Sequence, residues 1–234
     1  MPSLRPIPLP AALFALACSN DPAAASDSGK QTAEAAPPDV SVHGSVQEFL
    51  SWQPLPDFFV CIKDRAKPTC ATTGSDGEFT LPAPANSDVT FEFTRDGYVS
   101  VLVGIRTGTK DLEVLPMADS ATLSVKDVLT ASLGVTLDPE KGIIDVAAPA
   151  GEGVKLAMEP PSGVGPLFTA GLMIYANIDP GTITLSAEAQ AGPCTFSGLL
   201  WRGPTNGSVR VPIAADFITR LISLSCPAEG GTGD

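Results

Sequence analysis

Hydrophobic and polar residues alternate along most of the chain after residue 39. In residues 89–94, for example, Val89, Phe91 and Phe93 are separated by polar residues. Alternation with a period of two is typical of a β-strand that buries one face. The same pattern recurs in residues 40–46, 58–62, 79–81, 99–105 and 154–158, and further strands are predicted at 143–147, 172–178, 183–187, 209–213 and 217–226. We therefore predict short antiparallel strands that pack as β-sandwiches, with the long apolar segment 217–226 at the centre of a sheet.

Turns and one helical segment divide this pattern. Asp76-Gly77 and Asp96-Gly97 are hairpin signals, because glycine adopts positive φ easily. The alternation stops in residues 119–134, where apolar residues recur at helical spacing and end at Gly134. The predicted fold is therefore mostly β, with two antiparallel Greek-key β-sandwich domains, 40–118 and 138–226, joined by one short helix in the linker 119–137. We expect a disordered tail at 227–234.

The first predicted sandwich carries a set of motifs in a characteristic order. They are Val42–Val46, then Pro54-Leu55-Pro56 before Phe59–Ile62, then Gly74–Phe79, then Asp96-Gly97-Tyr98. This order resembles the bacterial carboxypeptidase regulatory-like domain, which has a transthyretin-like (prealbumin-like) seven-stranded sandwich. The turn Asn177–Thr182 resembles the same family, so the second half is predicted to be a weaker copy. The resemblance implies a binding or spacer module rather than a catalyst.

The first 39 residues differ from the rest of the chain. Residues 1–17 carry one charge, Arg5, before a short apolar run, which is typical of a secretory signal peptide. The run Phe14–Cys18 resembles the lipobox of bacterial lipoproteins and predicts lipidation of Cys18. A plain signal peptide followed by a chance cysteine is the alternative. Residues 19–39 contain no aromatic residue and no Val, Ile or Leu, so we expect a disordered tether.

Export makes disulfides possible for the four remaining cysteines. Cys61 and Cys70 lie close together in the sequence, and Cys194 and Cys226 belong to the second half. Four cysteines allow three pairings, and one disulfide within each half is the simplest. We do not favour a zinc site, because no C-x₂-C spacing occurs and the chain has a single histidine, His43.

Composition excludes several functions. The net charge of −12 argues against nucleic acid or an anionic membrane surface as a partner. No G-x-S-x-G nucleophile motif occurs, so we do not expect His43 to act as the base of a serine hydrolase. The turn carboxylates Asp76, Glu78, Asp138 and Glu140 lack the spacing of a calcium loop. The segment 160–166 lacks the lysine of a phosphate loop and is predicted to be a rigid surface loop. We therefore expect no catalytic residue, metal or cofactor.

Two tryptophans are the candidate ligand-binding residues. Trp52 and Trp201 both lie in loop-like sequence, where an exposed indole could stack on a sugar or a peptide side chain. Burial against a core is the other interpretation, and the commoner one for large aromatic residues. The sequence as a whole indicates a non-enzymatic lipoprotein of the cell envelope, in the outer membrane because Ser19 follows the cysteine. Its partner would be a glycan, a peptide or another envelope protein. The alternative is a carbohydrate-binding or accessory module for a separate envelope hydrolase.

Overall fold

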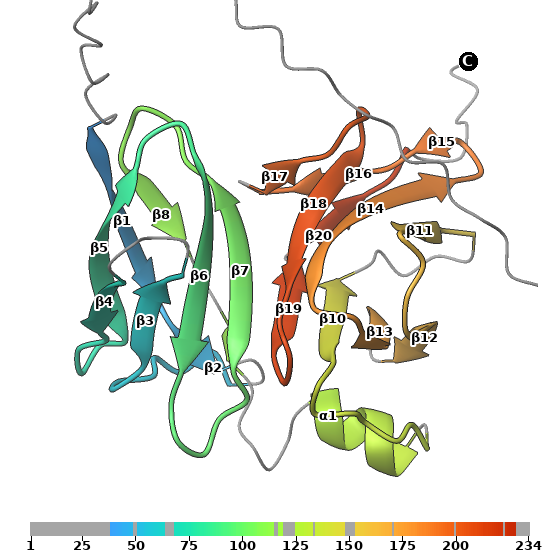
Figure 1. Ribbon diagram of the computed structural model, residues 1–234, viewed down its shortest axis with the longest axis horizontal. Coiled ribbons are helices and arrows are strands. Elements are labelled where there is room, and N and C mark those ends of the chain that lie inside the picture. The colour runs from blue at the N-terminus through green and yellow to red at the C-terminus, as the bar shows by residue number, and fades with distance from the viewer. Residues whose placement is uncertain are drawn as a thin grey trace, which may run out of the picture. The chain divides into compact units, whose positions relative to one another are not determined.

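The computed structural model describes residues 38–48, 51–63, 68–114, 117–118, 125–132, 134–147, 153–169, 171–198, 200–221 and 223–227 (Figure 1). The signal peptide, Cys18, nearly all of the tether and nearly all of the tail lie outside these residues. The described chain is mostly β, as the alternation predicts. No helix in these residues has the length and apolar character needed to cross a membrane.

We call residues 38–118 the N-terminal half and residues 134–227 the C-terminal half. The strands of the N-terminal half are β1 (Asp39–Ser45), β2 (Gln47–Glu48), β3 (Phe59–Ile62), β4 (Thr69–Thr72), β5 (Glu78–Pro84), β6 (Asp88–Thr94), β7 (Val101–Arg106), β8 (Leu112–Val114) and β9 (Met117–Ala118). The helical residues between the halves are α1 (Val125–Asp127) and η1 (Val128–Ser132). Leu129 of η1 is fully buried, so this residue belongs to the core, as its helical spacing predicts.

The strands of the C-terminal half are β10 (Gly142–Ala147), β11 (Lys155–Glu159), β12 (Val164–Thr169), β13 (Leu172–Ile178), β14 (Gly181–Ala189), β15 (Gly192–Pro193), β16 (Thr195–Ser197), β17 (Trp201–Arg202), β18 (Ser208–Ile213), β19 (Ile218–Leu221) and β20 (Ser223–Ser225). Two local predictions are wrong here. Residues 164–166 belong to β12 and not to a loop, because Val164 pairs with Ala176 of β13 and the ladder resumes at Leu167 after a register shift. Trp201 starts β17 and not a loop.

One large sheet runs through both halves. Within the described residues it has the strand order β12-β13-β10-β19-β7-β6-β3-β4. The two halves meet where β19 pairs with β7, with Ile218 opposite Val101. As predicted, the apolar segment near residue 218 lies inside a sheet, although β19 and β20 enter different sheets. The division into two domains stays a prediction, because a hydrogen-bonded ladder continues from one half to the other.

Two smaller sheets cover opposite faces of the large one. The sheet β5-β1-β8 packs on the β7-β6-β3-β4 part, and the sheet β11-β14-β18-β17 packs on the β12-β13-β10-β19 part. Paired residues of neighbouring strands share a face, so Val101 and Ile218 lie on the same side. Val101 belongs to the first core, whereas Leu221, which faces the other way, belongs to the second. Ile218 itself joins a third cluster with Leu129.

Strand direction is the main departure from the prediction. The large sheet and the sheet β5-β1-β8 are mixed rather than antiparallel, since β19 pairs in parallel with both β10 and β7, and β1 in parallel with β8. The sheet β11-β14-β18-β17 is antiparallel, as predicted. Alternation in a sequence reports which face of a strand is buried, but not its partner or its direction. Both predicted turns have positive φ, 75° at Gly77 and 81° at Gly97. The hairpin is confirmed at Gly97, between the paired strands β6 and β7, but the turn at Gly77 joins β4 to β5, which lie in different sheets.

Candidate functional site: an aromatic hollow at the end of the large sheet

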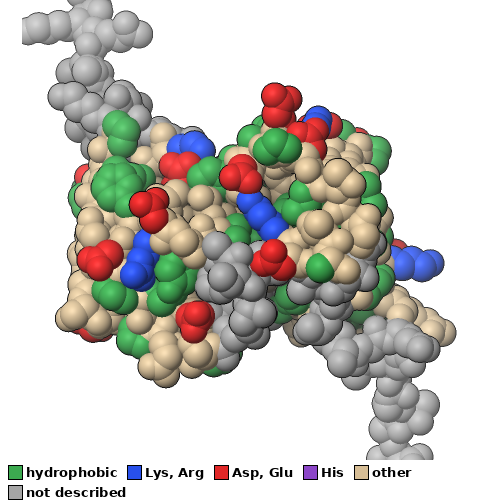
Figure 2. Space-filling view, turned by 90° about the horizontal axis from the view of Figure 1, so that it is seen from below, with side chains coloured by type: hydrophobic (Ala, Val, Ile, Leu, Met, Phe, Trp, Pro, Cys, Tyr) green, Lys and Arg blue, Asp and Glu red, His purple; other side chains and the backbone are tan. Residues whose placement is uncertain are grey.

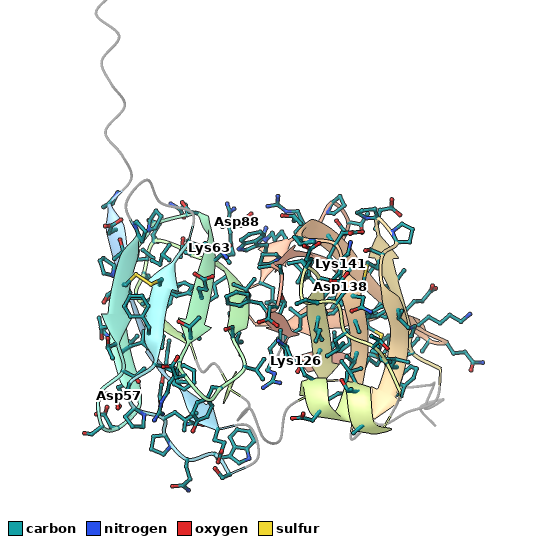
Figure 3. All side chains as sticks on the ribbon, turned by 60° about the horizontal axis from the view of Figure 1, so that its bottom comes forward. Asp57, Lys63, Asp88, Lys126, Asp138 and Lys141 are labelled. Carbon is teal, nitrogen blue, oxygen red and sulfur yellow. A yellow bond between two sulfur atoms is a disulfide. The ribbon has the colours of Figure 1, made fainter. Side chains whose placement is uncertain are left out.

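A hollow of about 580 Å³ lies over the start of β3 and the turn that joins β6 to β7. Asp57, Phe59, Arg95, Asp96 and Tyr98 supply its aromatic and charged lining. Asp57 is labelled in Figure 3, where it lies at one end of the N-terminal half while Asp88 lies at the other. Figure 2 views the molecule from the end where β6 joins β7 and shows acidic, basic and hydrophobic side chains intermingled on the N-terminal half. We call these five residues and the space between them the aromatic hollow.

The segment before β3 is held in place by one buried threonine. Thr73 accepts a hydrogen bond from the Phe58 N–H at its Oγ1 (2.9 Å) and donates that hydroxyl to the Leu55 carbonyl (2.8 Å). Its carbonyl accepts from the Asp57 N–H at 3.1 Å. Asp57 itself has φ of 58°, a left-handed conformation that aspartate tolerates better than most residues. These bonds fix the backbone from which Asp57 and Phe59 project.

Arg95 is held by aromatic rings. Its guanidinium carbon lies 5.0 Å from the centroid of Tyr98 and 5.8 Å from that of Phe58. Those two rings meet edge to face at 5.1 Å, and Phe58 is fully buried. Cation–π contacts leave the N–H groups of a guanidinium open to other partners. Among the described residues, the side chains of Arg95, Asp57 and Asp96 form no hydrogen bond or ion pair with one another or with any other side chain.

Phe59 supplies the exposed ring of the aromatic hollow. It is 50% exposed, whereas its neighbours Val60 and Ile62 point into the core. Phe59 lies between Thr72 of β4 and Thr94 of β6 in the sheet register. Sequence reasoning did not select Phe59, Asp57 or Arg95. The signal for Phe59 was present, because alternation in 58–62 that turns Phe58 and Val60 inward leaves Phe59 outside.

Trp52 is exposed, as a binding role requires. Its side chain is 63% exposed, and its φ of 58° is unusual for a bulky residue. The surrounding turn is well bonded. The Trp52 N–H donates to the Glu48 carbonyl (2.9 Å), and the Glu48 N–H donates to the Gln53 carbonyl (2.9 Å). The Ser51 hydroxyl donates to the Glu48 carboxylate. The loop therefore holds a strained tryptophan at the surface.

Trp201 is a packing residue, so we no longer treat it as a ligand-binding candidate. It is 8% exposed, and its indole N–H points at the carbonyls of Ile105 (3.1 Å) and Val89 (3.3 Å) in the N-terminal half. A Cβ atom on Gly104 would lie 3.4 Å from the indole, so glycine lets the ring approach β7. The ring is unavailable for stacking because this contact between the halves covers it.

Both predicted disulfides are present. Cys61 and Cys70 are directly opposed on β3 and β4, with Cα atoms 4.1 Å apart. Cys194 bonds to Cys226 across 32 residues of sequence. The first disulfide ties the edge strand β4 to β3, two residues along from Phe59 and on the same face of the sheet.

The other polar clusters are structural. His43 is exposed, and its Nδ1 lies 3.0 Å from the Thr80 hydroxyl. Asp145 and Arg220 form a buried ion pair across β10 and β19, which alternation in the sequence did not predict. The exposed Lys141 ammonium donates to Asp179, which lowers the pKa of that carboxyl and raises the pKa of Lys141. Within the described ranges, no three His, Cys, Asp or Glu residues are grouped as metal ligands.

Comparisons with known proteins identify no family. No family model matches the chain, and no curated protein matches it. Among solved structures it is similar to the Bacillus anthracis TIE protein, at 12% identity and a TM-score of 0.29, over 81% of this chain and 34% of that one. A Bacteroides uniformis protein that is only presumed to bind carbohydrate matches at 10% identity and a TM-score of 0.32, over 76% and 98%.

The minor pilin GBS52 of Streptococcus agalactiae matches at 9% identity and a TM-score of 0.27, over 83% of this chain and 99% of that one. The chain thus spans about a third of the length of the first of these structures and nearly all of the other two. All three TM-scores are below 0.5, so the proposals below rest on the residues of this chain.

Proposed function

We propose that this protein is an exported, non-enzymatic binding module that binds a neutral glycan in the aromatic hollow. The observation that carries the proposal is the half-exposed ring of Phe59 beside a guanidinium and two carboxylates that form no side-chain hydrogen bond or ion pair among the described residues. The aromatic hollow is open to solvent, so a ligand would lie along the surface rather than be enclosed.

Sugars present two kinds of surface, and the aromatic hollow has a complement for each. The C–H groups on one face of a pyranose ring are apolar and can stack on an aromatic ring such as Phe59. The hydroxyl groups at its rim both donate and accept hydrogen bonds. Asp57 and Asp96 can accept from them, and Arg95 can donate to them. The core of a protein interface is also enriched in aromatic residues and Arg, but it is depleted in carboxylates such as Asp57 and Asp96.

Charge favours a neutral ligand over an acidic one. The aromatic hollow contains two carboxylates and one guanidinium, so its own balance is negative. The whole chain has a net charge of −12, and removal of the predicted signal peptide with Arg5 takes this to −13. An anionic polysaccharide would be repelled at long range, most strongly at low salt.

The proposal includes attachment to the cell envelope. Lipidation of Cys18 would anchor the chain, and the polar residues 19–39 would act as a flexible tether. We further propose that the N-terminal half is a regulatory-like sandwich and that the C-terminal half is a diverged second copy. Cys18→Ala should release the protein from membranes in cell fractionation. Unchanged membrane association would contradict the lipid anchor without affecting the glycan proposal.

The binding test uses the full chain and neutral oligosaccharides. Isothermal titration calorimetry against cello-, malto- and chito-oligosaccharides should detect binding to at least one series. Phe59→Ala should weaken it by about tenfold, because it removes the stacking ring. Phe168→Ala is the matched control, since Phe168 is 63% exposed on β12 but does not line the aromatic hollow. This control should leave the affinity unchanged.

Several outcomes would overturn the glycan proposal. One is no binding to any neutral series. Another is equal losses in Phe59→Ala and Phe168→Ala. A third is binding of oligogalacturonate or of a peptide library in preference to every neutral sugar.

Arg95→Gln should weaken binding without unfolding the protein. Circular dichroism of each variant separates a loss of binding from a loss of folded structure.

A further inference from the structure

Trp52 adds a second exposed aromatic side chain to the end of the molecule that carries the aromatic hollow. The Trp52 loop returns to the end of β1, where the Leu55 N–H donates to the Val46 carbonyl at 2.8 Å. Asp57 follows Leu55 by two residues and begins the aromatic hollow. Both features therefore lie beyond Ser45, the last residue of β1.

The described N-terminal residues lie at the other end of β1. Asp39 is the first residue of β1, and it pairs with Pro84 of β5, whereas Ser45 pairs with Glu78. Seven residues of strand place the two ends roughly 20 Å apart. Figure 1 shows β1 running from the entry of the chain toward β2 and the turn between β6 and β7. The exposed aromatics thus lie at the end of the N-terminal half farthest from Asp39.

Trp52 and the aromatic hollow lie close together along the chain, within the reach of one oligosaccharide. Trp52 and Asp57 are five residues apart, so their Cα atoms lie within about 18 Å of each other even if the segment is fully extended. Two backbone hydrogen bonds join Glu48 to Trp52 and Gln53, and the Gln53 N–H also donates to the Ser51 hydroxyl. These bonds hold the backbone of Trp52 in a left-handed conformation that bulky residues rarely adopt.

We propose that Trp52 is a second sugar-binding position and that the ligand is a glycan chain rather than a single sugar or disaccharide. This inference rests on the proposed function, because it extends the same site. One sugar ring stacks on Phe59 in the aromatic hollow, and another ring further along the chain stacks on Trp52. Linking two contacts on one ligand makes the second contact intramolecular, so affinity rises with chain length.

The test compares ligand lengths in one series. With whichever neutral series binds the full chain, the hexasaccharide should bind at least about tenfold more tightly than the disaccharide. Trp52→Ala should remove this gain and leave the affinity for the disaccharide unchanged. Trp52→Tyr should retain most of the gain, because a phenol ring also stacks. Phe168→Ala again serves as the control for loss of an exposed aromatic residue.

The outcomes separate this inference from the proposed function. If Phe59→Ala weakens both ligands and Trp52→Ala weakens only the hexasaccharide, both proposals hold. If Trp52→Ala changes neither affinity, or changes both equally, the second position is refuted while the aromatic hollow stands as the site. If Phe59→Ala has no effect on any ligand, the proposed function fails, whatever the length dependence.

Discussion

Trp201 should stabilise the contact between the two halves, and its substitution tests that contact directly. The indole comes from β17 in the C-terminal half, and its N–H reaches two carbonyls of the N-terminal half. Those carbonyls belong to Val89 and Ile105, which are opposed on β6 and β7. A single side chain therefore bonds to neighbouring strands of the other half.

The structure separates two contributions of this side chain. Trp201→Phe keeps most of the buried ring and removes the N–H, so it should lower the free energy of unfolding by about 1 kcal/mol. Trp201→Ala also leaves a large cavity beside Gly104 and should cost about 3–5 kcal/mol. The larger loss is a substantial part of the 5–15 kcal/mol or so by which a typical native protein is stable.

Urea unfolding of the oxidised protein measures both values. Because Trp52 also fluoresces, the variants are made in a Trp52→Phe background, where emission reports on Trp201 alone in the parent. Trp52 is exposed, so this background substitution should change stability by less than about 0.5 kcal/mol. Far-ultraviolet circular dichroism follows the strands in the same samples. The two signals should coincide in the parent, since one sheet runs through both halves.

Three results would refute this reasoning. A loss of less than about 1 kcal/mol in Trp201→Ala would be typical of an exposed site and would contradict the buried contact. A fluorescence transition that precedes the circular dichroism transition would show that the contact opens before the strands unfold, so that the halves do not unfold together. Equal losses in Trp201→Phe and Trp201→Ala would assign the whole effect to the N–H and none to packing.

Three further predictions concern other parts of the molecule. Replacing both cysteines of the Cys194–Cys226 disulfide by Ala should lower the free energy of unfolding by about 3.5 kcal/mol, and replacing those of Cys61–Cys70 by about 2.5 kcal/mol. The difference arises because a disulfide that closes a longer loop restricts the unfolded chain more. Urea curves that reverse this order would contradict the loop-length argument. Lys141→Met should raise the pKa of Asp179 toward 3.8, because it removes the hydrogen bond and charge that lower it. In the native protein this pair stabilises the fold at neutral pH, and the contribution is lost as the pH falls below 3.8 through the lowered pKa; an unchanged carboxyl titration by NMR in the variant would refute it. Gly104→Ala should cost about 1–3 kcal/mol, because a Cβ there would lie 2.8 Å from Pro212; an unchanged urea midpoint would show that the proline moves aside freely.

The sequence determined which face of β6 packs in the first core, although β7, β10 and β19 are buried on both faces. Val89, Phe91 and Phe93 alternate with polar residues, and all three lie in the first core. The two disulfides could also be anticipated, since cysteines close in sequence or within one half are the simplest to join. Alternation succeeds here because successive side chains of any strand point to opposite faces, whatever the strand pairs with.

Only the tertiary structure decided which strands pair and what lies at the surface. Val101 and Ile218 are neighbours although more than a hundred residues separate them, and no local pattern encodes that parallel pair. No local pattern distinguishes the two tryptophans either, since both have loop-like sequence contexts but one is buried and the other exposed. Trp201 is covered because a distant pair of strands offers its carbonyls to the indole, whereas Trp52 stays exposed on its turn. The aromatic hollow likewise exists because the register of β3 and β6 brings Asp57 and Phe59 beside Arg95.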